Sequence, residues 1–169
     1  MLKKIVMLSV LLLMSSGAFA AGEVAFIDLQ KALNLSDAGV KAKAEIGQQV
    51  KKYEAEVAAE QQALKDMQKE MEKQAVLLSD DARAKKEREF QQRAKEFQRF
   101  TKDIQDELQQ KDADFTRRII DEILKTARQL GKEKGYGMIL EKAESSIIYG
   151  DPALDLTDDV IKAFNLSSK

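Results

Sequence analysis

Residues 37–134 contain no proline and only three glycines, and this long uninterrupted segment limits the fold more than any other feature. Charged residues, alanine and glutamine dominate it, and these residue types favour the α-helix. Its apolar side chains recur at spacings that alternate between four and three residues. Such a seven-residue repeat forms one narrow stripe along a helix and predicts a coiled-coil seam.

Two seams follow one another in this segment. The first comprises Ile46, Val50, Tyr53, Val57, Leu64, Met67, Met71 and Leu78, with Glu60 and Gln74 at the two positions that lack an apolar residue. The second comprises Phe90, Ala94, Phe97, Thr101, Ile104, Leu108, Lys111 and Phe115. Two consecutive seams separated by a break predict two helices that fold back on each other.

In an antiparallel hairpin the numbers of facing residues have a constant sum. A sum of 161 pairs apolar or small residues along most of the two seams, for example Met67 with Ala94, and places Glu60 opposite Thr101. The same sum puts the fold point between residues 80 and 81, next to Ser79. Serine is a preferred residue at helix N-caps. We therefore expect a hairpin arm over residues 37–118 with its tip near 78–81.

The apolar face widens after residue 118. The added apolar residues are Ile119, Ile120, Ile123, Leu124, Ala127 and Leu130. A wider face indicates more neighbours, so the second helix is expected to enter a compact body made of residues 21–36 and 119–169. The body is expected to contain a strand near 24–28, one or two helical turns at 29–33, and a last helix with Thr157 as its N-cap.

Two further strands are expected in the body, at 137–142 and 146–150, joined by a short polar turn. A body of this size buries little surface alone, and its strand edges need partners. The sequence therefore predicts a mainly α protein with a small β body, from which a long antiparallel two-helix coiled-coil hairpin projects. It also predicts that the chain forms oligomers through the body.

Residues 1–20 have the pattern of a secretory signal peptide. Lys3 and Lys4 precede a short apolar run, and Ala18-Phe19-Ala20 matches the small-x-small pattern that signal peptidase recognises. The run is too short to span a bilayer, which takes about 20 apolar residues. We expect export and cleavage after Ala20. Removing the two lysines from the 28 basic residues leaves 26 against 29 acidic ones.

Composition argues against an enzyme. The chain has no cysteine and no histidine, so thiol chemistry, the most common metal ligand and the usual near-neutral base are absent. Its carboxylates lie on helix faces among lysines and arginines, which is typical of a solvated helix. We therefore expect no catalytic residues, no metal and no cofactor. Export and net negative charge also argue against nucleic acid as a partner.

Charge is distributed unevenly along the second helix. Residues 83–102 contain eight basic residues and three glutamates. The basic residues nearest the tip are Arg83, Lys85, Lys86 and Arg88, and they favour contact with an anionic surface or chain. Solubility of an ordinary charged helix explains the same pattern, and both interpretations stay open.

Several apolar residues near the tip lie off the seams or are unusually adaptable. Val76, Leu77 and Phe100 cannot all face the partner helix, and Met67 and Met71 have flexible, polarisable side chains. Surfaces of this kind are used by proteins that bind many partners. We expect these five residues to contact a client protein, although single exposed apolar residues are also normal.

Two stretches of the sequence resemble a known family. Residues 24–31, Val-Ala-Phe-Ile-Asp-Leu-Gln-Lys, are similar to the opening of Skp/OmpH-like proteins. Residues 135–140, 147–152 and 154–165 resemble their closing strand–strand–helix unit. The resemblance covers the whole chain that remains after signal cleavage.

The resemblance implies a periplasmic, ATP-independent holding chaperone. It implies a homotrimer whose bodies join through their strands and whose arms surround a cavity for unfolded outer-membrane proteins. The best-known members are markedly basic, whereas this chain is slightly acidic, so the implied contact with anionic lipid or lipopolysaccharide is limited to residues 83–102. The alternative hypothesis is a structural or adaptor coiled coil of the cell envelope, which would join two fixed partners.

Overall fold

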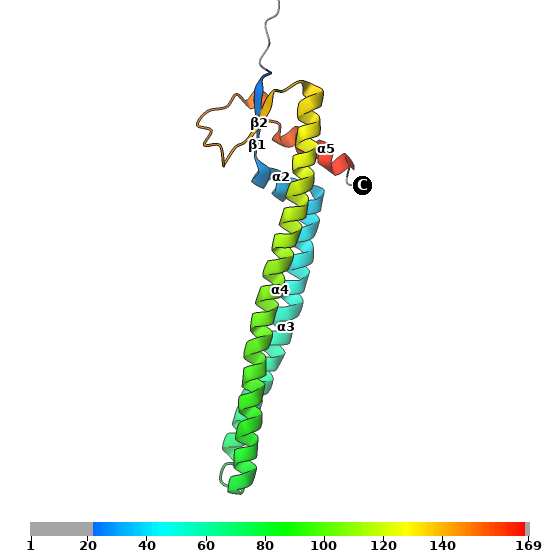
Figure 1. Ribbon diagram of the computed structural model, residues 1–169. Helices are drawn as coiled ribbons and strands as arrows, with labels where there is room; N and C mark the ends of the chain where they lie inside the picture. Colours follow the sequence, from blue (N-terminus) through cyan, green and yellow to red (C-terminus); the bar gives the residue numbers. More distant parts are fainter. Residues whose placement is uncertain (1–21, 168–169) are drawn as a thin grey trace, which may run out of the picture.

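The computed structural model describes residues 22–167. The elements, in chain order, are β1 (Val24–Ile27), α2 (Leu29–Leu35), α3 (Asp37–Gln74), α4 (Asp80–Lys134), β2 (Met138–Glu141), the 3₁₀ turn η1 (Pro152–Leu154) and α5 (Thr157–Ser167). Figure 1 shows α3 and α4 as a long helical hairpin that extends from a small body at one end. The expected signal peptide, residues 1–20, lies outside the described residues.

The hairpin is held by the two predicted seams. Every seam position from Ile46 to Leu78 and from Phe90 to Phe115 is half-buried, and none is fully buried. This pattern follows from geometry, because each helix can cover only one side of the other. With about 1.5 Å per residue, the 38 residues of α3 extend about 57 Å.

Two of the three polar side-chain contacts across the hairpin agree with the predicted register, whereas the numbers of the third pair, Glu60 and Arg93, add to 153. The Tyr53 hydroxyl donates a hydrogen bond to Glu107 Oε2 at 2.8 Å, and Lys86 Nζ donates to Gln74 Oε1 at 2.7 Å. The residue numbers of each of these two pairs add to 160, which is within one of the predicted sum. The seam spacing alone therefore determined which parts of the two helices lie side by side.

The turn between the helices lies at residues 75–79, so its start is three residues earlier than the expected tip at 78–81. Ser79 does cap α4, since its side chain accepts a hydrogen bond from the backbone N–H of Ala82. The difference is at the end of α3, which stops at Gln74. Seam spacing determines the facing residues, but it does not determine how many residues the connecting turn needs.

A single buried residue joins α2 to α3. Ser36 is fully buried, and its backbone N–H donates to Ala32 O at 3.1 Å at the end of α2. Its hydroxyl accepts from the Gly39 N–H at 3.2 Å and so caps the start of α3. The short connection sets the direction of the arm relative to the body.

The body contains a two-stranded parallel sheet. β1 pairs with β2 in the register Val24 to Met138 and Ile27 to Glu141, so the whole hairpin connects the two strands. On the other edge of β1, the Leu156 N–H donates to Phe26 O at 2.9 Å. The first and last parts of the body are thus joined through β1.

The expected strand at 146–150 is wrong. Residues 142–146 form turns, with the Ser145 N–H donating to Glu141 O at 3.0 Å and Ser146 at a φ of 50°. These turns direct the chain away from β2, and Ile148 and Tyr149 then lie in an exposed loop, visible in Figure 1 to the left of the sheet. Apolar residues of strand type were present, but no strand in the described part of the chain lies beside them.

The core of the body lies between the sheet, α4 and α5. Its most buried residues come from distant parts of the chain, and they include Ala25, Ile27, Ile123, Leu156 and Val160. On α4 the fully buried residues are Ile119, Ile123, Ala127 and Gly131, and all lie after residue 118, where α4 was expected to enter the body. At Gly131 a Cβ would lie 2.6 Å from Ile139 Cδ1, so a larger residue there would require the end of the Ile139 side chain to shift.

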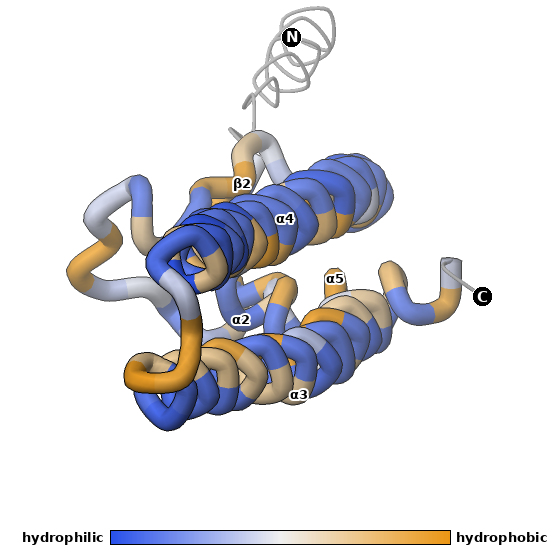
Figure 2. Tube along the Cα trace, turned by 90° about the horizontal axis from the view of Figure 1, so that it is seen from below, coloured by the Kyte–Doolittle hydropathy of each residue, from blue (hydrophilic) through white to orange (hydrophobic). Residues whose placement is uncertain are grey.

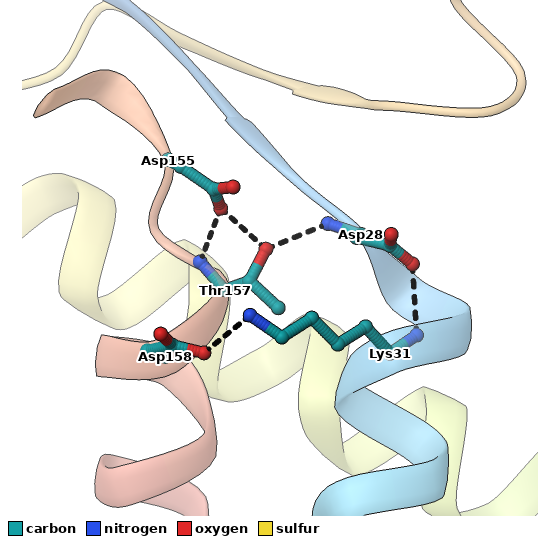
Figure 3. A network of polar contacts seen from close by, with 5 residues as sticks. All are labelled: Asp28, Lys31, Asp155, Thr157 and Asp158. Atoms are coloured by element: carbon teal, nitrogen blue, oxygen red, sulfur yellow. Dashed lines mark hydrogen bonds and ion pairs between the residues drawn. The ribbon is translucent and has the colours of Figure 1, made fainter. Parts of the chain in front are cut away.

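A polar network fastens the start of α5 to the start of α2 (Figure 3). The buried Thr157 hydroxyl accepts from the Asp28 N–H at 2.9 Å and donates to Asp155 Oδ1 at 2.5 Å. Lys31 Nζ bonds Asp158 at 2.7 Å, and this hydrogen bond raises the pKa of Lys31. The expected N-cap role of Thr157 is wrong, because Asp155 Oδ1 accepts from the Thr157 N–H and the Thr157 side chain faces inward.

The register can be tested with a disulfide, because the natural chain contains no cysteine. Replacing Met67 and Ala94 with cysteine should give an intramolecular disulfide under mild oxidation, since the two positions face each other. Mass spectrometry of the intact and digested chain measures the crosslink. Pairing Met67→Cys with Gln98→Cys, about one helical turn away, is the control. Efficient crosslinking of only the control pair would show that the register is wrong.

Candidate functional site

The described residues contain no arrangement suited to catalysis. They include no group of three or more acidic side chains that could hold a metal ion. A recess of about 440 Å³ lies where α2 meets the base of the hairpin, and its only charged lining residues are Lys43 and Asp112. One lysine and one carboxylate do not form the pair of positioned acid and base groups that general acid–base chemistry needs.

The free end of the hairpin has two exposed apolar side chains. Val76 is 92% exposed and Leu77 is 84% exposed. Figure 2, seen from below, shows this turn as a hydrophobic stretch at the near end of a largely hydrophilic hairpin. The backbone of the turn is well bonded, because the N–H groups of Leu77 and Leu78 both donate to Gln74 O, at 2.9 and 3.1 Å. The turn therefore holds its shape while the two side chains face solvent.

The four predicted basic tip residues divide into two pairs. Arg83 and Lys86 stabilise the turn: Arg83 Nη2 donates to Ala75 O at 2.7 Å, and Lys86 Nζ donates to the Gln74 side chain. Lys85 and Arg88 are exposed and make no ion pair with any other residue that the structure describes. Only the second pair is fully available to an external anionic group.

The five predicted client-contact residues are not brought together. Met67 and Met71 are half-buried in the seam, where they hold the two helices together. Phe100 is half-buried beside Glu60 and Arg93, along the edge of the seam. Val76 and Leu77 are the exposed members of the set. Phe100 lies 20 residues from the start of α4 at Asp80, which corresponds to about 30 Å along the arm from the turn that carries Leu77.

The two polar seam positions have partners that the sequence analysis missed. Glu60 was expected opposite Thr101, but its carboxylate bonds Arg93 Nη2 at 2.8 Å. Gln74 bonds Lys86 in the same way. The sequence analysis overlooked a series of long polar side chains on α4 that are spaced seven residues apart. Each of them comes one residue before a seam position, as Arg93 does before Ala94. Tyr53 belongs to the same group of contacts, and its hydrogen bond to Glu107 raises the pKa of Tyr53.

No helix in the described part of the chain is both long and apolar enough to cross a bilayer.

Comparison with known proteins places these features in a family. The family model described as "Outer membrane protein (OmpH-like)" matches residues 23–164. A Skp-like protein of Pseudomonas aeruginosa is 26% identical over 164 residues, which are 95% of this chain and 94% of the relative. An uncharacterized protein of Aquifex aeolicus is 26% identical over 140 residues, 83% of this chain and 84% of that relative.

The fold is also shared with a solved structure. A crystal structure described as an OmpH-like outer membrane chaperone from Caulobacter crescentus superposes with a TM-score of 0.81 at 21% identity, over 88% of this chain and 86% of the other.

The role of Arg83 at the turn can be measured by hydrogen–deuterium exchange. Arg83→Met removes the hydrogen bond to Ala75 O, and a charged hydrogen bond at an exposed position contributes about 1 kcal/mol. The amides of residues 75–79 should then exchange about fivefold faster. Arg88→Met removes a similar side chain that has no partner and should leave these rates unchanged. Equal rates in both variants would contradict the structural role of Arg83.

Proposed function

The chain belongs to the OmpH/Skp-like family of periplasmic outer membrane chaperones, and we propose that it acts as an ATP-independent holding chaperone for unfolded outer-membrane proteins. The family is not an enzyme family. In this proposal the signal peptide is removed after Ala20, and the remaining chain binds its clients in the periplasm, keeps them from aggregating and releases them when they fold into the membrane.

The observation that carries the proposal is the exposed apolar turn at the end of a long charged arm. Val76 and Leu77 lie at the point of the hairpin farthest from the body, where a large unfolded chain can reach them without obstruction. Full burial of one such side chain contributes about 1.5–3 kcal/mol. Contacts of this size hold a client reversibly, so release needs no nucleotide.

A trimer would give the arms a shared cavity. In this arrangement residues 21–36 and 119–169 form the joined bodies, and residues 37–118 of each chain form one arm. Two features of the body support assembly through it. β2 has a neighbouring strand on one edge only, and the loop beside the sheet has two almost fully exposed large side chains, Ile148 at 102% and Tyr149 at 84%. Three arms around a cavity would present several tips to one client.

The same tip is suited to an anionic surface. Lys85 and Arg88 have no partner among the described residues, and they lie within about three turns of Val76 and Leu77. Anionic lipid or lipopolysaccharide is the corresponding partner near the outer membrane. Contact there would bring a held client close to the bilayer in which it folds.

The holding function is tested by aggregation of a urea-unfolded outer-membrane barrel protein after dilution, without ATP. The unaltered chain at stoichiometric amounts should keep several such proteins soluble, as measured by light scattering. Val76→Ser with Leu77→Ser should weaken client affinity about tenfold at any salt concentration, because apolar contacts are not screened. Lys85→Glu with Arg88→Glu should weaken affinity at low salt and have little effect near 1 M salt.

A matched control is Leu35→Ser with Leu166→Ser, which removes two exposed apolar side chains from the body instead of the tip. This variant should hold clients as the unaltered chain does. Circular dichroism and light scattering must first show unchanged helicity and oligomer size in all variants. If the unaltered chain leaves every barrel protein to aggregate, the chaperone proposal fails and an adaptor coiled coil becomes the better explanation.

Assembly through the body is tested by replacing the exposed loop residues. Ile148→Asp with Tyr149→Asp places two charges where the proposed contact would be buried and should convert a trimer into monomers, as measured by light scattering coupled to size exclusion. Val76→Asp with Leu77→Asp, an equal change at the tip, should leave the trimer intact. A trimer that survives the loop change and dissociates after the tip change would place assembly in the arms.

A further inference from the structure

The two sides of the seam between α3 and α4 have different chemistry. The first side, which we call the charged flank, holds Lys86, Arg93, Phe100 and Glu107 of α4, spaced seven residues apart. The three side-chain contacts across the hairpin, Tyr53–Glu107, Glu60–Arg93 and Gln74–Lys86, all lie on it. The charged flank therefore holds the two helices in register.

The other side carries five glutamines together with Glu54, which faces Gln105 because their numbers add to 159. Each of them follows a seam position by one residue, which places it on the opposite side of the seam from the charged flank. In the antiparallel register these residues meet across the hairpin, since the numbers of Gln61 and Gln98, and of Gln68 and Gln91, both add to 159. We call this row the glutamine flank, and its members are Gln61, Gln68, Gln91, Gln98 and Gln105.

The glutamine flank has no part in holding the hairpin. All five side chains are exposed. Within the described residues no side chain of the row bonds the facing helix, and the one recorded side-chain contact is Gln68 Nε2 with Glu72 Oε1 at 3.2 Å, along α3 itself. The two facing pairs, Gln61 with Gln98 and Gln68 with Gln91, form a neutral stretch in a chain in which 34% of residues are charged. Apart from the Gln68 amide, which bonds Glu72, the side-chain amides of the row make no recorded hydrogen bond within the described residues and can pair with an external partner.

We propose that the glutamine flank binds extended segments of the unfolded client through the client's backbone. This inference rests on the proposed holding function. A primary amide offers the same donor and acceptor groups as a peptide bond, so it can pair with any extended backbone whatever its side chains. The neutral pairs Gln61–Gln98 and Gln68–Gln91 also repel neither acidic nor basic clients. Unfolded barrel strands expose such unpaired backbone groups over their whole length.

The dimensions of the row suit an extended chain. From Gln91 to Gln105 there are 14 residues, which corresponds to about 21 Å along α4. A strand rises about 3.3 Å per residue, so about six client residues span this distance. Successive glutamines on one helix are about 10.5 Å apart, close to three client residues. The tip would then supply apolar contacts and the glutamine flank backbone contacts to the same client.

The test compares two sets of glutamine replacements in the full-length exported chain. The first set is Gln61→Ala, Gln91→Ala and Gln98→Ala. The matched control is Gln62→Ala, Gln92→Ala and Gln110→Ala, which alters exposed glutamines on the outer faces of the same helices. Alanine is a better helix former than glutamine, so neither set should lower helicity, and circular dichroism checks this.

Client affinity is measured by titrating a fluorescently labelled, urea-unfolded barrel protein after dilution. The first set should weaken affinity about tenfold, equally at 0.15 M and 1 M salt, because uncharged hydrogen bonds are lost. The control set should stay within about twofold of the unaltered chain. A photo-crosslinking residue at Gln98 should also label the client, whereas the same residue at Gln92 should not.

The possible failures can be told apart. If the unaltered chain binds clients and the two sets bind them equally well, the glutamine flank is not a client surface, and the holding function itself remains. If the first set fails only at low salt, the contact is electrostatic and the backbone-pairing account is wrong. If the unaltered chain binds no unfolded barrel protein, the proposed function fails and this inference fails with it.

Discussion

Half-burial along the seam between α3 and α4 is the constraint on which the rest of the structure depends. Two helices cover only one side of each other, so every seam side chain from Ile46 to Leu78 and from Phe90 to Phe115 remains partly exposed. Such a hairpin has no core of its own. Its base must therefore be held by the body, through Ser36 on one helix and through residues 119–131 on the other. Contacts such as Glu60–Arg93 then keep the helices in register along the arm.

The same constraint leaves most of the arm surface available for binding. A narrow seam occupies one stripe of each helix, and the charged flank uses one of its two edges. The turn with Val76 and Leu77, the unpaired Lys85 and Arg88, and the glutamine flank are then free. Each offers a different kind of weak contact: apolar, electrostatic and hydrogen-bonding. A protein that holds many unfolded chains without an energy source needs such weak and varied contacts more than it needs one tight site.

Much of the fold could be predicted because the relevant patterns are local. The seven-residue repeat predicted both seams. It also predicted a sum of 161 for the numbers of facing residues, and the pairs Tyr53–Glu107 and Gln74–Lys86 each add to 160. The wider apolar face after residue 118 predicted where α4 enters the body. The strand predicted at 146–150 failed for a non-local reason, since a strand needs a neighbour and residues 22–167 place none beside Ile148. Thr157 was predicted to be the N-cap of the last helix. Its hydroxyl instead accepts a hydrogen bond from the Asp28 N–H, 129 residues away in the chain.

The candidate site was harder to predict for a related reason. Sequence alone could mark Met67, Met71 and Phe100 as apolar, but only the packed hairpin shows that they are half-buried while Val76 and Leu77 are exposed. The sequence also showed how many basic residues lie near the tip. It did not show that Arg83 and Lys86 donate hydrogen bonds to residues at the turn. Long flexible side chains choose their partners in three dimensions, and their spacing in the sequence does not reveal the choice.

Hydrogen–deuterium exchange of the whole chain, with and without an unfolded outer-membrane protein and without nucleotide, tests most directly the claim that the arm is the client-binding element. We expect slower exchange on client binding in the turn at 75–79 and in the adjoining parts of α3 and α4, while the core segment 119–131 keeps its rates. Protection confined to the body, or no protection anywhere despite client binding, would contradict this claim.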